Sequence, residues 1–145
     1  MTGSIDPTKE SFAAFKALSR GGPIWMLNLL RFRAVAAYPS DHPNAGKGLS
    51  GAEAYRQYGR ESAPVFQRVG GRQAWLATPE LVVIGPADES WDLAFVAEYP
   101  SADAFVEMLR DPAYKVAVAH RTAAVQDSRL IRMSPRRTSG HVFGD

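Results

Sequence analysis

The sequence predicts an α+β domain, because the same order of strand, helix and strand occurs twice between residues 23 and 133. The first copy covers residues 24–32, 51–69 and 72–84, and the second covers residues 93–99, 102–126 and 129–133. A β-α-β-β-α-β order is typical of the ferredoxin-like fold, a four-stranded antiparallel sheet with both helices on one face. The other face has no helix, and an uncovered apolar face is a usual place for a partner or a ligand.

Length and composition indicate one folded domain. The chain has 145 residues, of which 46% are hydrophobic and 22% charged, and it has no cysteine. A core of useful size is therefore expected, whereas disulfides, thiolate metal sites and thiol nucleophiles are excluded. The sequence has neither an 18-residue apolar run nor a secretory leader, so we expect a cytoplasmic protein with no membrane partner.

The predicted domain has three parts: an N-terminal helical segment (1–22), the ferredoxin-like core (23–133) and a flexible tail (134–145). In the first part, Asp6 is a good N-cap and Pro7 a good first helical residue. Apolar residues then recur at helical spacing until two glycines end the run. This predicts an extra N-terminal helix outside the repeated unit.

The first strand of the core, residues 24–32, is almost continuously apolar. Such a run is typical of a strand that is buried on both faces, although helices cover only one face of this sheet. We therefore expect a homodimer that covers the other face. Residues 34–50 follow as a long insertion that contains Pro39, Pro43, Gly46 and Gly48. Loops of this length are often lids or partner contacts.

The helix boundaries of the core follow from local signals. Ser50 and Glu53 have the spacing of a capping box, and Pro64 predicts a kink in the helix that begins there. Ser101 is the expected cap of the second helix, which Asp111 and Pro112 divide into two pieces.

Arg121 is the most unusual residue of the second helix, because it lies on the apolar face that also carries Tyr114 and Val118. A buried guanidinium needs a carboxylate, backbone carbonyls or an anionic ligand. Arg121 is thus either a structural side chain or a clamp for a ligand carboxylate. Glu98 is a candidate partner, although it is expected on the open face of the sheet. There, burial would raise the pKa of Glu98 and make it a candidate base.

Other polar side chains are candidates for ligand binding or catalysis. Asn28 interrupts an apolar strand face and could orient a carbonyl, and Arg31 could bind an anion at the end of the same strand. Tyr55 and Tyr58 share a helix face, either as core residues or as part of a site. His120 titrates near neutral pH and is a candidate proton carrier. The three histidines are far apart in sequence, so we expect no metal site and no cofactor.

Short motifs in the expected order carry a resemblance to a known family. They are Ala54-Tyr55, Tyr58, Pro64, Gly70-Gly71, Glu98-Tyr99-Pro100-Ser101, Asp111-Pro112-Ala113-Tyr114 and Arg121. This succession resembles the family called domain of unknown function 1330, which belongs to the dimeric α+β barrel superfamily. The resemblance implies a homodimer whose sheets face each other, with a cleft between sheet and helices in each subunit. Of the matching positions, we expect Glu98, Tyr55, Tyr58, Tyr114 and Arg121 to lie near a site.

The resemblance leaves the function open, because relatives in the superfamily include cofactor-independent oxygenases, lactone isomerases, heme-dependent enzymes and small-ligand regulatory modules. The leading hypothesis is a homodimeric small-molecule-binding protein for an aromatic or carboxylated metabolite. As an enzyme it would be oxygenase- or isomerase-like and free of metal and cofactor. Arg121 or Arg31 would hold the anion, and Glu98 or His120 would move a proton.

The alternative is a non-catalytic dimeric structural or regulatory module with a filled barrel. Nucleic-acid binding is not expected, although the isoelectric point is about 9.1. The strands lack the basic and aromatic pattern of RNA-binding sheets, and much of the basic excess lies at the end of the chain.

Overall fold

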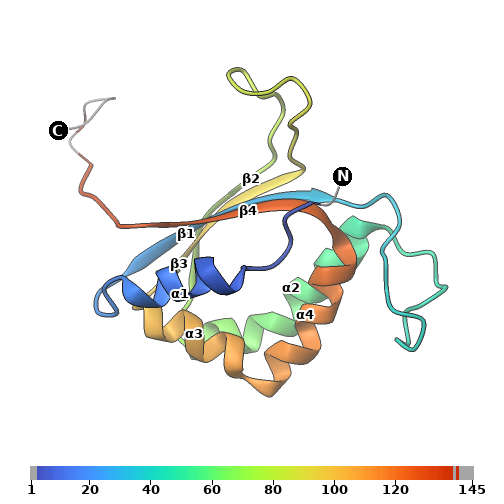
Figure 1. The fold of residues 1–145 in the computed structure, drawn as a ribbon, viewed down its shortest axis with the longest axis horizontal. Helices are drawn as coiled ribbons and strands as arrows, with labels where there is room; N and C mark the ends of the chain where they lie inside the picture. Colours follow the sequence, from blue (N-terminus) through green and yellow to red (C-terminus); the bar gives the residue numbers. More distant parts are fainter. Residues whose placement is uncertain (1–2, 139, 141–145) are drawn as a thin grey trace.

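The computed structural model describes residues 3–138 and residue 140, which form a sheet and a layer of helices on one side of it (Figure 1). The described strands are β1 (Ile24–Phe32), β2 (Arg72–Ala77), β3 (Leu93–Tyr99) and β4 (Val125–Met133). The described helices are α1 (Lys9–Ala17), α2 (Gly51–Arg68), α3 (Ala102–Arg110) and α4 (Pro112–Ala124).

The sheet has the strand order β2-β3-β1-β4, and all neighbouring strands are antiparallel. β1 and β3 are the central strands, α2 connects β1 to β2, and α3 with α4 connects β3 to β4. This arrangement is the predicted ferredoxin-like fold, with α1 as an additional helix on the same side of the sheet (Figure 1).

The side chains of the sheet alternate between a helix face and an open face. On β1, the buried residues Ile24, Met26 and Leu30 belong to the two clusters that form the core under the helices. The intervening residues Trp25, Leu27 and Leu29 are half-buried on the open face, where Leu27 is paired with Val96 and Ile131. Both faces of β1 are thus apolar, although helices cover only one.

The helix boundaries agree with most of the sequence-based predictions. Ser50 and Glu53 form the expected capping box, and Ser101 and Asp111 cap α3 and α4. α2 continues through Pro64 to Arg68. The N-cap of α1 is Thr8, which forms a capping box with Ser11, so the prediction of Asp6 was wrong. Thr8 takes this place because its side chain accepts from the backbone amide of Ser11, which otherwise has no partner within the helix.

One predicted strand end and one predicted helix end were wrong. β2 ends at Ala77, which is paired with Ala94, and the expected extension to residue 84 does not form because β3 begins only at Leu93. The last helix ends at Ala124 instead of residue 126, because Val125 already pairs with Phe32 of β1. Residues 34–50 form the predicted irregular insertion. The expected tail falls partly on residues 139 and 141–145, which lie outside the described residues.

The start of α2 is in close contact with the backbone of two other elements. A Cβ atom on Gly51 would lie 2.3 Å from the carbonyl oxygen of Arg33 and 2.7 Å from that of Ala124. We predict that Gly51→Ala lowers the free energy of unfolding by about 1–3 kcal/mol, because the backbone must shift to admit the methyl group. Urea denaturation at fixed protein concentration measures this change.

Gly59, in the middle of the same helix, provides the matched control, because a Cβ atom there meets nothing within 4 Å. Gly59→Ala is expected to raise the free energy of unfolding by about 0.5–1 kcal/mol, because alanine has the higher helix propensity. An unchanged stability of Gly51→Ala would contradict the close packing described for this helix end.

Candidate functional site

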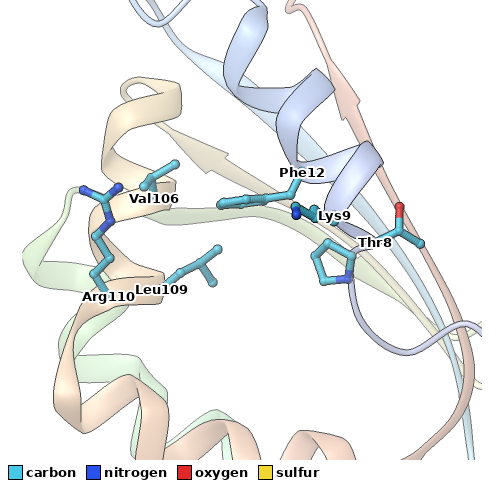
Figure 2. Close-up of a pocket in the computed structure, with 7 residues that line it drawn as sticks. Thr8, Lys9, Phe12, Val106, Leu109 and Arg110 are labelled. Carbon is cyan, nitrogen blue, oxygen red and sulfur yellow. The ribbon is translucent and has the colours of Figure 1, made fainter.

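A groove with a volume of about 440 Å³ lies between the N-terminal part of α1 and α3 (Figure 2). The residues that line it are Pro7, Thr8, Lys9, Phe12, Val106, Leu109 and Arg110. The floor is mostly apolar, with Phe12 on one side and Val106 and Leu109 on the other. Two cationic side chains, Lys9 and Arg110, complete the lining.

Aromatic packing holds α1 beside α3 and so defines the width of the groove. Phe15 lies one turn after Phe12, and its ring centroid is 5.2 Å from that of Phe105. Arg132 of β4 fixes the other end of α1, because its guanidinium donates to the backbone carbonyls of Phe15 and Ser19. Phe12 is thereby held opposite α3 without filling the groove.

The charge around the groove is predominantly positive. Neither Lys9 nor Arg110 forms an ion pair with a residue that the structure describes, and no carboxylate lines the groove. A smaller hollow of about 90 Å³ lies beside it and shares Val106 and Arg110. Lys16, Arg20 and Asp103 also line that hollow. An anion in the groove would therefore meet unpaired cations.

The predicted tyrosines meet in the core between α2 and α4. The hydroxyl oxygens of Tyr58 and Tyr114 are 2.8 Å apart, and the ring of Tyr55 is 5.2 Å from that of Tyr58. Burial raises the pKa of all three phenols, so they stay protonated at neutral pH. Tyr58 and Tyr114 thus share a hydrogen bond, and Tyr55 packs against Tyr58.

Arg121 binds a backbone carbonyl instead of a carboxylate. Its Nη1 donates to the carbonyl oxygen of Ile5 at 2.6 Å. The neighbouring Ser4 accepts from the hydroxyl of Ser128 at 2.7 Å, and its amide donates to Asp127. Arg121 therefore fastens the N-terminal segment over α4 and β4, which supports a structural role for this side chain.

His120 lies in a hydrogen-bonded cluster under the 34–50 insertion. Its Nε2 is 3.0 Å from the carboxylate of Glu61, and its Nδ1 is 2.7 Å from the phenol oxygen of Tyr38. The carboxylate can only accept, so in the neutral ring Nε2 carries the proton and Nδ1 accepts from Tyr38. Gln57 donates to the same carboxylate and accepts from Asn44 of the insertion. The cluster holds the insertion against α2 and α4.

The remaining candidates lie elsewhere on the sheet. Glu98 is on the open face and forms an ion pair with Arg72 of the edge strand. Arg31 is on the same face, 3.6 Å from Asp127, whereas Asn28 faces the helices and donates to the carbonyl of Met26. Glu98 therefore meets neither Arg121 nor His120.

The expected residues thus do not form one site. The structure brings the three tyrosines together, and it places Glu98 with Arg31 on the open face and His120 under the insertion. Several residues were not predicted from the sequence: Lys9, Leu109 and Arg110 of the groove, and the His120 partners Tyr38 and Glu61. Their spacing gives no signal, because Tyr38 and His120 are separated by 82 positions.

Within residues 3–138 and 140, no group of three or more His, Asp or Glu side chains could hold a metal ion. No helix among these residues is long and apolar enough to cross a membrane.

Comparison with known proteins identifies the family. The sequence pattern of the family described as domain of unknown function DUF1330 matches residues 49–133. The chain belongs to the DUF1330 family. The matched segment runs from the start of α2 to the end of β4, so it includes one wall of the groove, α3, but not α1. No curated protein matches the chain significantly.

Solved structures of a protein of unknown function have the same fold. The RPA0582 protein from Rhodopseudomonas palustris is 58% identical and has a TM-score of 0.86, with 94% of this chain and all of that chain covered. The methylated RPA0582 protein is 57% identical, with a TM-score of 0.88 and coverage of 96% and 99%. SnoaB, a cofactor-independent oxygenase from Streptomyces nogalater, is 16% identical, with a TM-score of 0.50 and coverage of 83% and 100%. At this identity, the likeness to SnoaB shows the fold alone.

The His120 cluster predicts a pH dependence of stability. Burial lowers the pKa of His120 below its usual value, so the unfolded chain binds the proton more readily than the folded chain. The contribution of this residue is therefore complete above about pH 6.5, and it is lost as the pH falls below that value towards the lowered pKa of the folded state. We predict that His120→Gln flattens the loss of unfolding free energy below about pH 6.5, measured by urea denaturation.

Tyr38→Phe tests the same cluster with the imidazole retained. This variant loses one hydrogen bond, so its free energy of unfolding is expected to be about 1 kcal/mol lower at every pH in this range. The dependence of that free energy on pH is expected to keep the wild-type slope. If the unfolding free energy of His120→Gln depends on pH as strongly as that of the wild type, His120 does not cause the pH dependence.

Proposed function

We propose that this DUF1330 protein is a homodimeric small-molecule-binding protein whose ligand has an apolar body and a negatively charged group. The observation that carries the proposal is the groove between α1 and α3, with its apolar floor and two unpaired cations (Figure 2). A volume of about 440 Å³ is within the range of small-molecule sites, roughly 300–1,000 Å³.

The lining indicates the chemistry of the ligand. Phe12, Val106 and Leu109 offer an aromatic ring and two aliphatic side chains to the apolar body. Arg110 can bind a carboxylate through two parallel hydrogen bonds, and Lys9 adds a second positive charge. An aromatic or aliphatic carboxylate is therefore the favoured class of ligand.

The open face of the sheet supports the homodimer. Trp25, Leu27 and Leu29 line its centre, and Trp75 and Ile131 beside them are about half exposed. A second copy of this face would remove these side chains from water. The groove lies on the helix side, so a ligand would bind independently of this interface (Figure 1).

Oxygenase- or isomerase-like catalysis without metal or cofactor is the narrower version of the proposal. It requires a base in contact with the ligand, and the groove offers only Lys9 and Arg110 as charged groups. His120 is enclosed by Tyr38 and Glu61, and Glu98 is paired with Arg72 on the open face. Binding without catalysis is thus the function that the geometry supports best.

The alternative is a structural or regulatory module with a filled barrel. This alternative is compatible with ligand binding, because the groove lies on the helix side and not inside the barrel.

A fluorescent aromatic sulfonate tests the groove. We predict that anilinonaphthalene sulfonate binds to the wild type and that Arg110→Gln raises its dissociation constant about ten-fold, the equivalent of about 1.4 kcal/mol. Loss of a charge-assisted hydrogen bond is the physical reason. A fluorescence titration measures the affinity, and Val106→Trp, which fills the groove, is expected to abolish binding.

Two controls isolate the charge. Arg60→Gln removes an exposed arginine of α2, which does not line the groove, and is expected to keep the wild-type affinity. Uncharged phenylnaphthylamine is expected to bind equally to the wild type and to Arg110→Gln. If Arg110→Gln and Val106→Trp both bind the sulfonate as tightly as the wild type does, the dye binds elsewhere and the groove is rejected as the site.

The dimer is tested separately by native mass spectrometry. We predict that the wild type has twice the mass of the 15.8 kDa chain. Ile131→Lys should raise the dissociation constant of the dimer at least a hundred-fold, because it places a charge opposite Leu27 in the centre of the open face. Val116→Lys, at an exposed site on α4, is the matched control and should remain dimeric. A monomeric wild type would reject the dimer but not the groove.

A further inference from the structure

The connection between β2 and β3, residues 78–92, has no regular structure and projects away from the sheet on the side opposite to the helices (Figure 1). We call this segment the arm. Leu81, Val83 and Ile84 are 80%, 83% and 94% exposed. Three aliphatic side chains this exposed in one short segment form an apolar patch that the fold of the single chain does not cover.

The base of the arm is fixed to the open face of the sheet. Asp92 accepts a hydrogen bond from the amide of Phe32 at 2.8 Å and donates its own amide to the carbonyl of Leu30 at 2.7 Å. The guanidinium of Arg129, which is on the open face of β4, lies 5.1 Å from the ring centroid of Trp91. The oxygen Oε1 of Glu89 is 3.7 Å from the same guanidinium. These contacts set the direction in which the arm leaves the sheet.

We propose that the arm is a dimerisation arm, which packs its apolar tip against a second copy of this chain. This inference rests on the proposed dimer, because a copy seated on the open face would lie beside the arm. In a two-fold symmetric dimer each chain contributes one arm, so the contact is made twice.

Continuity with the open face supports the second copy as the occupant. Trp75 and Ile131, both about half exposed, lie on the face from which the arm projects, and Trp75 is on the strand that leads into it. The arm therefore leaves the sheet on the side where a second copy that covers these side chains would lie (Figure 1).

A dilution series in sedimentation velocity tests the arm. Ile84→Glu is expected to raise the dissociation constant of the dimer at least ten-fold, because it places a charge in the apolar contact. The substitution leaves the fold intact, since Ile84 is 94% exposed, and circular dichroism verifies this. Val116→Glu, at a 65% exposed valine on the helix side, is the matched control and is expected to leave the constant unchanged.

The outcomes separate the arm from the dimer. If Ile84→Glu dimerises with the wild-type constant, the arm does not contact the second copy, whereas the dimer across the open face stands. If the wild type is monomeric at all concentrations, the dimer is rejected and the arm with it. If Val116→Glu weakens the dimer as much as Ile84→Glu, the effect is general and the arm is rejected.

The cysteine-free chain allows a direct second measurement. A single thiol introduced by Ile84→Cys can carry a benzophenone maleimide label, which crosslinks to neighbouring chains on illumination. We expect a covalent dimer whose crosslinked peptide contains the label on one chain and an unlabelled segment of the other. Crosslinks confined to one chain would reject the arm contact.

Discussion

The structure depends on one constraint: the sheet has two apolar faces, whereas all the described helices lie on one of them. β1 expresses this constraint most clearly. Ile24, Met26 and Leu30 are buried under the helices, and Trp25, Leu27 and Leu29 form the centre of the open face. Burial of apolar area provides the main driving force for folding and association. In a single chain, β1 buries only part of its apolar area. The proposed dimer and the arm follow from this imbalance.

On the helix side, arginines close the fold by binding backbone carbonyls. Arg121 holds Ile5, and Arg132 holds the C-terminal end of α1 at Phe15 and Ser19. These contacts attach the N-terminal segment, which lies outside the repeated unit, to α4 and β4. The attachment also creates the groove, because α1 contacts α3 through Phe15 while Phe12 stays apart from Leu109.

The fold could be predicted from the sequence because its determinants are local. Periodicity identified the strands and helices, and Ser50, Ser101 and Asp111 marked helix starts through interactions within three residues. Strand ends were less predictable, since β2 stops where β3 no longer provides a partner. Asp6 and Thr8 are both good N-caps, and the sequence pattern did not distinguish them.

The site was less predictable, because its contacts join distant segments. The partners of His120 come from the 34–50 insertion and from α2, and the groove combines α1 with α3. The unusual position of Arg121 was correctly identified, and a backbone carbonyl was among its expected partners. Its association with Ile5 depends on where the N-terminal segment crosses the fold, which helical periodicity does not specify.

The coverage of the open face can be measured directly through tryptophan fluorescence. The chain has three tryptophans. Trp25 and Trp75 lie on the open face, and Trp91 packs against Arg129 on the same side. Acrylamide quenching, measured over a dilution series, therefore reports on this face alone. If a second copy covers the face, quenching is weak at high protein concentration and increases on dilution. Strong quenching that is independent of protein concentration would contradict the account.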